Sequence, residues 1–225
     1  MRVLCLAPHC DDETLGCGGT LARYVLEGHE VTVAVVTGPG EGEHPVFPRA
    51  AWDTVRAEAK VAMDALGVRE LWFDNQPAVL LADLPKHALN RSVQLLVERA
   101  RPEVLFVPHP FDLHKDHREV FDAASVAWRP VHDVGRGIQE IYAYEVLSET
   151  GWNAAGVEPG FVPNVWVDVS TTLDKKLRAL AAYRSQLRPF PDARSVEAAE
   201  HLARYRGAQM GMMAAEAFVL VRGRR

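Results

Sequence analysis

Residues 31–37 form a continuous apolar and β-branched run, and this run constrains the fold of the chain more than any other feature. A strand of this kind is typical of a parallel sheet that is buried on both faces. Similar strand runs alternate with stretches of helical apolar spacing: strands at 3–7, 70–73, 104–107 and 217–221, and helices at 49–66, 89–100, 173–183 and 196–205. The alternation predicts right-handed βαβ crossovers. We therefore expect an α/β fold, a Rossmann-like parallel sheet flanked by helices.

The size and charge of the chain exclude several classes of protein. Its 225 residues, 48% of them hydrophobic, suit a single domain that spans 1–225. The net charge of −5 and the scattered Lys and Arg residues argue against nucleic acid or an anionic membrane as a partner. The sequence shows neither a signal peptide nor an apolar run of membrane length, so we expect a cytoplasmic protein.

All three cysteines, Cys5, Cys10 and Cys17, fall in the first predicted strand–helix unit. An odd number of cysteines without distant partners does not suit a disulfide framework. We expect three buried, reduced thiols. The alternative for Cys10, which lies on the loop, is a thiolate ligand or nucleophile.

A cluster of polar residues follows the first predicted strand. His9, Asp11, Asp12 and Glu13 come directly after the apolar run 3–7, and a glycine-spaced helical segment follows them. Ligands of open α/β sheets bind outside the carboxyl ends of the strands. This loop can therefore offer one imidazole and one carboxylate to a metal ion and keep the second carboxylate as a base. The same acidic residues also suit a helix N-terminus, where capping and the helix dipole favour carboxylates.

A second polar cluster follows the predicted strand at 104–107. Three histidines and two aspartates lie within nine residues there: His109, Asp112, His114, Asp116 and His117. Packing of a hydrophobic core does not explain such a cluster of histidines and aspartates. If the two loops meet at the edge of the sheet, they form a site of His, Asp and His with an open position for water. Three protein ligands are typical of catalytic zinc, whereas structural zinc has four.

The two motifs in this order resemble those of the zinc-dependent PIG-L/LmbE-like de-N-acetylases: His9-x-Asp11-Asp12-Glu13, and then His114-x-Asp116-His117. Later segments around Tyr144, Phe161, Arg194 and Arg206 are also similar to bacterial members, so the resemblance covers nearly the whole chain. One departure is Cys10, which stands where the family usually has proline. Members of this family remove an acetyl group from N-acetylglucosaminyl substrates and related amino sugars.

The resemblance implies a role for each matching residue. His9, Asp12 and His117 would bind Zn²⁺, one ion per chain, and other divalent ions could substitute. Asp11 would be the general base, and His114 would stabilise the oxyanion or donate a proton. Amide hydrolysis requires the same roles of metal ligand and general base. Zinc lowers the pKa of a bound water to about 7, and the carboxylate beside it can take the proton.

Two further acidic residues are expected to support this site. We expect Asp116 to hold the ring of His114 in the right tautomer, as carboxylates commonly do beside site histidines. Glu13 is expected to cap the helix or to orient the site rather than to catalyse.

Three residues are candidates for binding the substrate. Arg56 and Asp74 are similar in position to a sugar-contacting Arg and Asp of the family, and such a pair suits hydroxyl groups. Arg56 is equally well explained as an ordinary residue on a helix surface. Asp112 either contacts the ligand or closes its own turn.

The leading functional hypothesis is a zinc-dependent hydrolase that removes an acetyl group from an N-acetylated amino sugar. The alternatives are a metallo-hydrolase of another small amide or ester, and a non-catalytic ligand-binding protein in which the metal is structural. A base that is not a ligand and a ligand count of three argue against the structural alternative.

The sequence says least about the partners and the oligomeric state of the protein. The family resemblance implies a small-molecule substrate as partner and a homo-oligomer, a hexamer or trimer, although monomers also occur. The apolar stretch 210–215 contains three methionines, which suit a contact surface. The preferred interpretation of these methionines is that they fill the gap between the last helix and the sheet.

Overall fold

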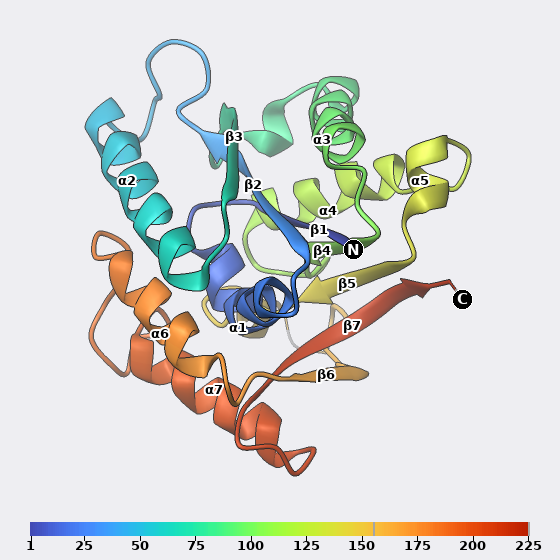
Figure 1. Cartoon of the computed structure of the whole chain (residues 1–225). Helices are drawn as coiled ribbons and strands as arrows, with labels where there is room; N and C mark the ends of the chain where they lie inside the picture. The colour runs from blue at the N-terminus through green and yellow to red at the C-terminus, as the bar shows by residue number, and fades with distance from the viewer. Residues whose placement is uncertain (155, 225) are drawn as a thin grey trace.

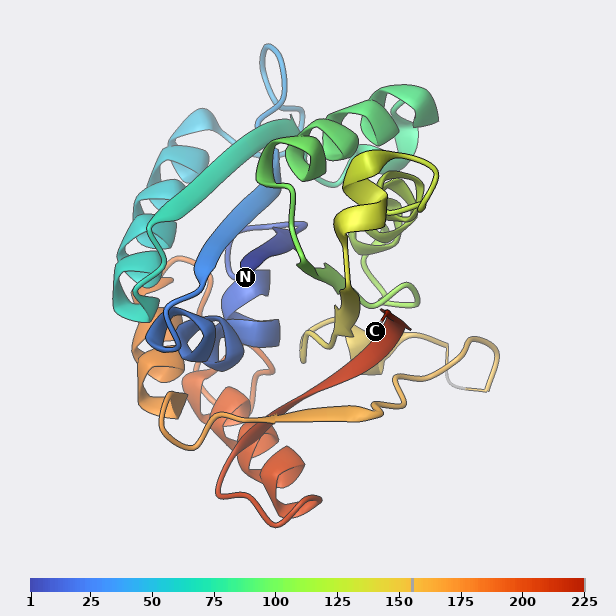
Figure 2. The same ribbon diagram turned by 45° about the vertical axis from the view of Figure 1, so that its right-hand side comes forward.

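The computed structural model describes residues 1–154 and 156–224, which form a seven-stranded sheet with helices on both faces (Figures 1 and 2). The strands are β1 (Arg2–Ala7), β2 (Glu30–Gly38), β3 (Glu70–Pro77), β4 (Val104–Pro108), β5 (Glu140–Tyr144), β6 (Val165–Asp168) and β7 (Ala215–Gly223). The helices are α1 (Asp12–Leu26), α2 (Arg49–Leu66), α3 (Lys86–Ala100), α4 (Lys115–Ala127), α5 (Asp133–Gly137), α6 (Leu173–Ala182) and α7 (Val196–Ala208), with 3₁₀ turns at Leu81–Asp83 and Thr150–Trp152. All the predicted strands and helices are confirmed; β5 and β6 had not been predicted.

The strand order is β3-β2-β1-β4-β5-β7-β6. Strands β1 to β5 are mutually parallel, which confirms the predicted Rossmann-like sheet. Strand β7 is the exception in this mostly parallel sheet, since it runs antiparallel to both β5 and β6. Two helices, α6 and α7, connect β6 to β7. A single crossover helix joins two parallel strands, because the chain reverses once along the helix and once again as it enters the next strand. With two helices the chain reverses one more time, so β7 runs antiparallel to β6.

The sheet separates two apolar cores. Successive side chains of a strand point to opposite faces, so Val3 and Cys5 of β1 pack into one core while Leu4 and Leu6 pack into the other. Helices α1, α2 and α6 cover the first core and helices α3 and α4 the second (Figure 1). The order of strands reverses between β1 and β4, which places the loops after these two strands side by side.

Several expectations about single residues can be compared with the structure. The three cysteines are buried and unpaired within the described chain, as predicted. Met210 and Met213 do not fill a gap, since they are 51% and 74% exposed in the turn between α7 and β7, whereas Met212 is half-buried. Among the described residues, no helix combines the length and the apolar character needed to cross a membrane.

A buried ion pair joins the C-terminal part of the chain to α1. Helix α1 is interrupted at Cys17, which has a non-helical φ of −142°. Glu216 of β7 accepts hydrogen bonds from the backbone N–H groups of Gly19 (2.9 Å) and Thr20 (2.7 Å) beside this break. Lys176 of α6 donates to Glu216 and to the carbonyl of Leu15 (2.9 Å). The pair therefore satisfies backbone groups that the interrupted helix leaves without partners.

We expect Lys176→Met to lower the free energy of unfolding by about 3–5 kcal/mol, because removing one partner of a buried pair leaves an uncompensated charge. Urea unfolding followed by circular dichroism measures this change. The matched control is Lys175→Met, since Lys175 is the neighbouring lysine and forms no ion pair in the described structure. Equal stability of the two variants would contradict the role of the ion pair.

Candidate metal centre and active site

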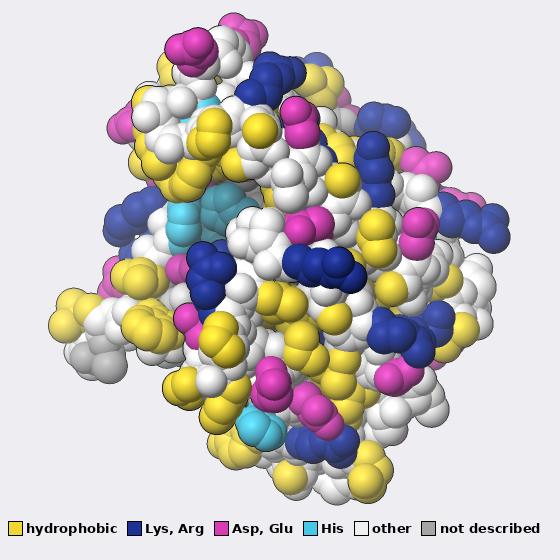
Figure 3. Space-filling model, turned by 90° about the vertical axis from the view of Figure 1, so that its left-hand side faces the viewer, with side chains coloured by type: hydrophobic (Ala, Val, Ile, Leu, Met, Phe, Trp, Pro, Cys, Tyr) yellow, Lys and Arg dark blue, Asp and Glu magenta, His cyan; other side chains and the backbone are white. Residues whose placement is uncertain are grey.

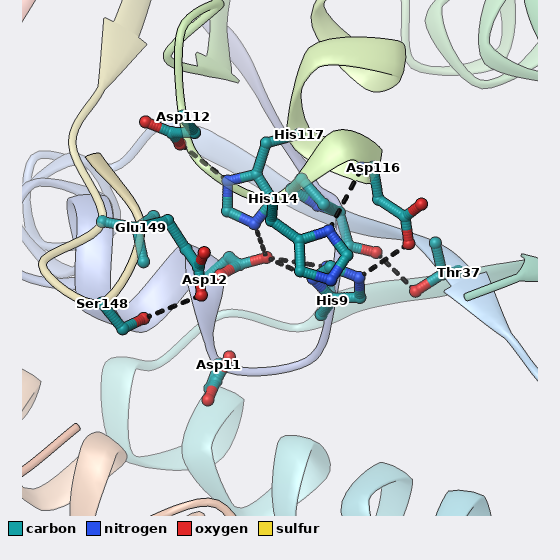
Figure 4. A network of polar contacts seen from close by, with 12 residues as sticks. His9, Asp11, Asp12, Thr37, Asp112, His114, Asp116, His117, Ser148 and Glu149 are labelled. Atoms are coloured by element: carbon teal, nitrogen blue, oxygen red, sulfur yellow. Dashed lines mark hydrogen bonds and ion pairs between the residues drawn. The ribbon is translucent and has the colours of Figure 1, made fainter. Parts of the chain in front are cut away.

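The loops after β1 and β4 meet at the carboxyl edge of the sheet, as the sequence predicts (Figure 4). His9 lies in the turn after β1, and Asp12 is the first residue of α1. His114 caps the N-terminus of α4, and Asp116 and His117 lie in the first turn of this helix. Two helix N-termini therefore point their backbone N–H groups and positive dipole ends at one place, which favours the burial of carboxylates there.

His9, Asp12 and His117 bring one ligand atom each within 4.8 Å of one another. Asp12 is fully buried, and its Oδ2 lies 3.1 Å from Nε2 of His117 and 3.2 Å from Nδ1 of His9. Ligand atoms that share one tetrahedral zinc ion at about 2.0–2.2 Å would lie about 3.3 Å apart. The spacing around Asp12 therefore suits a metal ion.

Two outer carboxylates orient the two imidazoles. Nδ1 of His117 donates to Oδ2 of Asp112 (2.7 Å), and Nε2 of His9 donates to Oδ2 of Asp116 (3.0 Å). An ionised carboxylate can only accept a hydrogen bond. The proton of each neutral ring is therefore held on the outer nitrogen, and the lone pair of the inner nitrogen faces Asp12. Such carboxylate–histidine pairs are typical of metal ligands.

Unpartnered atoms distinguish this triad from a second one. Among the residues that the structure describes, Oδ1 of Asp12 and Nε2 of His117 are buried without a hydrogen-bond partner. His9, His114 and Asp116 form an alternative set of three within 4.8 Å. Asp116, however, already accepts hydrogen bonds from His9 and from the backbone N–H groups of Val79 and Leu81. The triad with Asp12 and His117 is the one that leaves ligand atoms available, and its donor set suits a divalent transition metal.

The charges around the triad favour a positive ion. Burial by itself would lower the pKa of His117, but the carboxylates of Asp12 and Asp112 raise it to about 10. Burial opposes the protonation of His9 in the same way, and Asp116 and Asp12 raise its pKa to about 9. Without metal, protons therefore occupy the inner nitrogens. A metal ion would take the place of these protons.

Asp11 lies beside the triad but outside it (Figure 4). Its φ of 105° is in the left-handed region, an uncommon conformation that is typical of strained functional positions. The backbone N–H of Asp11 donates to Oε2 of Glu13 (3.2 Å), which supports this conformation. Burial and the charge of Asp12 raise the pKa of Asp11 to about 8, and Arg194, with Nη1 3.9 Å from the carboxylate, opposes this rise.

His114 presents an N–H group at the same place. Its Nδ1 accepts a hydrogen bond from the backbone N–H of Asp116 (3.1 Å), so the proton of the neutral ring must be on Nε2. Burial and the neighbouring His9 lower the pKa of His114 to about 4. The ring is therefore neutral and can donate one hydrogen bond.

The structure corrects the expected partners of Asp116 and Asp112. The carboxylate of Asp116 contacts His9 and the backbone of Val79 (2.6 Å), not the ring of His114. Only the backbone of Asp116 reaches His114, because the first turn of α4 directs its side chain toward β1 and the turn after β3. Asp112 is fully buried behind His117, so it neither reaches a substrate nor merely closes its own turn.

Arg56 and Asp74 do not form the expected pair. Side chains alternate along β3, and Asp74 points toward α3, where it accepts a hydrogen bond from Ser92. Arg56 of α2 lies on the opposite face of the sheet and donates to Asn75 (2.9 Å). Asp74 therefore faces α3 and not the triad, whereas Arg56 lies near the carboxyl ends of β2 and β3.

Three residues around the site lacked an assigned role in the sequence interpretation. Arg194, in the loop before α7, lies 3.4 Å from Glu149 as well as near Asp11. The hydroxyl of Tyr183 donates to Oε1 of Glu13 (2.6 Å), which fixes this carboxylate in the supporting role that was expected. These residues come from loops and helix ends far along the chain. In the sequence, they could have been found only because they lie in segments that resemble the family.

A cavity of about 190 Å³ opens beside the triad. Its lining combines apolar side chains with five polar residues, His9, Asp11, His114, Gln186 and Arg194. On the face seen in Figure 3, histidine side chains lie in a recess between hydrophobic and basic side chains. A second cavity of about 420 Å³ adjoins it and shares Gln186 and Arg194 with it.

Comparisons with known proteins agree with this site. Residues 4–128 match the family model described as PIG-L, GlcNAc-PI de-N-acetylase. A 1D-myo-inositol 2-acetamido-2-deoxy-alpha-D-glucopyranoside deacetylase of Actinosynnema mirum is 30% identical over 85% of this chain and 82% of its own. The diacetylchitobiose deacetylase of Thermococcus kodakarensis is 25% identical, over 85% of this chain and 71% of its own.

Solved structures show the same fold. The conserved protein TT1542 of Thermus thermophilus is 30% identical, with a TM-score of 0.75 over 97% of this chain and 94% of its own. A 4-carboxy-2-hydroxymuconate hydratase of Pseudomonas putida also has a TM-score of 0.75, at 20% identity, over 100% of this chain and 98% of its own. The fold thus accommodates more than one reaction, but the family model spans both polar loops, and the chain belongs to the PIG-L de-N-acetylase family.

Proposed function

We propose that this protein is a zinc-dependent deacetylase that removes the acetyl group from an N-acetylglucosaminyl substrate. The observation that carries the proposal is a His–Asp–His triad, with Asp12 and His117 fully buried and His9 half-buried, and a separate carboxylate, Asp11, beside it. The relatives named as deacetylases of acetylated glucosamine compounds support the same substrate class. His9, Asp12 and His117 would hold the ion. When bound, zinc would lower the pKa of a coordinated water to about 7 and polarise the amide carbonyl.

The side chains of the chain itself supply the proton transfers. Asp11 accepts a proton from the attacking water, whose oxygen forms the new bond to the carbonyl carbon. Nε2–H of His114 donates a hydrogen bond to the carbonyl oxygen as negative charge develops on it. The C–N bond then breaks, and Asp11 returns its proton to the leaving amine. The products are acetate and the free amino sugar, and Asp11 is ionised again.

Arg194 and Glu149 fit this scheme as groups that position the base. Arg194 is close enough to Asp11 to favour its ionised form, and Glu149 holds the guanidinium in place. Hydrolysis of another small amide or an ester would use the same groups. The products released from a panel of substrates distinguish these reactions.

The first test concerns the metal. We expect about one zinc ion per chain, and we expect His117→Ala and Asp12→Ala to lose most of it, because each removes one of three ligands. Metal analysis of the purified proteins by mass spectrometry measures the occupancy. His201→Ala is the control, since this exposed histidine packs on Phe190, away from the triad. Full occupancy in both ligand variants would refute the assignment.

The second test concerns the outer carboxylate. Asp112→Ala should weaken zinc binding about 10–100-fold, because His117 loses the acceptor that holds its ring. Competition with a chelating dye gives the affinity. Asp112→Asn keeps an oxygen acceptor for Nδ1–H, so it should lose less affinity than the alanine variant. Unchanged zinc affinity in Asp112→Ala would contradict this role.

The third test separates the base from the ligands. Asp11→Asn should keep its zinc and lose about a hundredfold or more in turnover, the usual contribution of a positioned acid–base group. Acetate release from a panel of N-acetylglucosaminides measures the loss, and Asp64→Asn on the exposed side of α2 is the control. If Asp11→Asn lost its metal instead, Asp11 would be a ligand.

A further inference from the structure

Glu149 is a buried carboxylate beside the triad. It is 8% exposed and lies directly before the 3₁₀ turn Thr150–Trp152, in the segment that follows β5. Its backbone carbonyl accepts a hydrogen bond from the backbone N–H of Leu113 (3.1 Å), in the loop after β4. Strands β4 and β5 are neighbours, so this bond joins two loops at the carboxyl edge of the sheet. In Figure 4, Glu149 lies on the side of Asp12 that is away from His114.

The carboxylate of Glu149 has unused hydrogen-bonding capacity. Ser148 and Arg194 both donate to Oε1, each over 3.4 Å. In the part of the chain that the structure describes, no group donates to Oε2, and this atom is accessible to solvent. An ionised carboxylate offers about four lone-pair sites. Glu149 can therefore accept a further hydrogen bond from a ligand.

The ion pair between Glu149 and Arg194 is also loose. Arg206 and Glu145, by comparison, form a bidentate pair with N···O distances of 2.8 and 2.7 Å, typical of strong charge-assisted hydrogen bonds. Arg194 instead lies between two carboxylates, 3.4 Å from Glu149 and 3.9 Å from Asp11. When both are ionised, they carry one negative charge more than this guanidinium balances. Burial raises the pKa of Glu149, so a second cation would favour its charged form.

The two cavities place Glu149 on the nitrogen side of a bound amide. Asp11 and His114 line the 190 Å³ cavity, Glu149 lines the 420 Å³ cavity, and Arg194 lines both. In the proposed reaction the carbonyl oxygen lies at His114, in the smaller cavity. The larger cavity offers more room for the sugar ring. The amide nitrogen, which joins the carbonyl carbon to the sugar, would then lie at the junction, between Asp11 and Glu149.

We propose that Glu149 recognises the nitrogen of the scissile amide. Its carboxylate accepts a hydrogen bond from the N–H group of the substrate and binds the ammonium group of the product. An ester has no N–H, and its bridging oxygen would face the carboxylate without a proton between them. Glu149 therefore makes the site selective for amides over esters. This inference rests on the proposed function and adds the residue that selects the bond to be cleaved.

The proton balance of the reaction provides the cation. Hydrolysis first gives acetic acid and the neutral amine, which has received its proton from Asp11. Acetic acid then releases its proton, and the amine takes one up. An α-amino group has a pKa of about 7.7–8.0, and an amine of this kind is mostly protonated at pH 7. The product is therefore an ammonium ion, which can donate to Oε2 of Glu149.

Calorimetry with D-glucosamine at pH 7 tests the product contact without turnover. We expect zinc-loaded Glu149→Gln to bind glucosamine about tenfold to a hundredfold more weakly than the native protein, because a hydrogen bond between charged groups is lost. Metal analysis verifies that the zinc content is unchanged. The control is Glu197→Gln, since the side chain of this exposed residue of α7 forms no ion pair in the described structure. Unchanged glucosamine affinity in Glu149→Gln would overturn the inference.

A comparison of an amide with an ester tests the selectivity. N-acetylglucosamine and 2-O-acetylglucose differ in the atom that links the acetyl group to the sugar, and acetate release measures both reactions. Glu149→Ala should lower kcat/KM for the amide about tenfold to a hundredfold more than for the ester, because only the amide loses a hydrogen bond. Glu149→Gln keeps an oxygen acceptor and should change this ratio less. An equal loss for both compounds would show that Glu149 acts only through Arg194, which would also overturn the inference.

The remaining outcomes separate the two proposals. If the native protein deacetylates N-acetylglucosamine and the Glu149 variants match it in both assays, the inference is overturned while the deacetylase proposal stands. If the zinc-loaded protein releases acetate from neither compound but Glu149→Gln loses affinity for glucosamine, the deacetylase proposal fails and the contact of Glu149 with the amine stands.

Discussion

The burial of the Asp12 carboxylate between two imidazoles is the interaction on which the rest of the site depends. A fully buried charge needs a compensating partner. Here the compensation comes from His9 and His117, each held from behind by a second carboxylate, and from the N-terminus of α1. The arrangement concentrates negative charge around a small space, which explains why a cation, whether protons or a metal ion, is favoured there.

The same carboxylates connect the site to the walls of its cavity. Asp116 holds His9 on one side and the turn at Val79 on the other, so His9 and this wall of the cavity share one anchor. Glu13 plays a similar part on the opposite side, since it binds both the backbone of Asp11 and the hydroxyl of Tyr183. The groups proposed to act on a substrate are thus supported by buried hydrogen bonds, which keep them in place before a ligand binds.

The fold alone does not decide what this site does. A hydratase shares the same architecture, so the reaction must be argued from the residues at the carboxyl edge of the sheet. The turns and helix starts that follow β1 and β4 supply the triad, Asp11 and His114, to which the proposed reaction is assigned. Loops from the later part of the chain supply Arg194 and Glu149. Loops tolerate change more readily than packed elements, so the residues around a substrate can differ more easily than those at the helix starts.

The sequence by itself determined the parallel part of the sheet and the two polar loops, because these depend on short-range patterns and on the rule that ligands bind at the carboxyl ends of strands. It also identified the residues of the triad through their resemblance to a family. Only the tertiary structure decided that Asp112 supports His117, that Asp116 supports His9, and that Asp74 faces α3. It also decided the direction of β7 and which segments line the two cavities beside the triad. These features depend on which face a side chain takes and on which distant segments pack together, and no local pattern of residues encodes either.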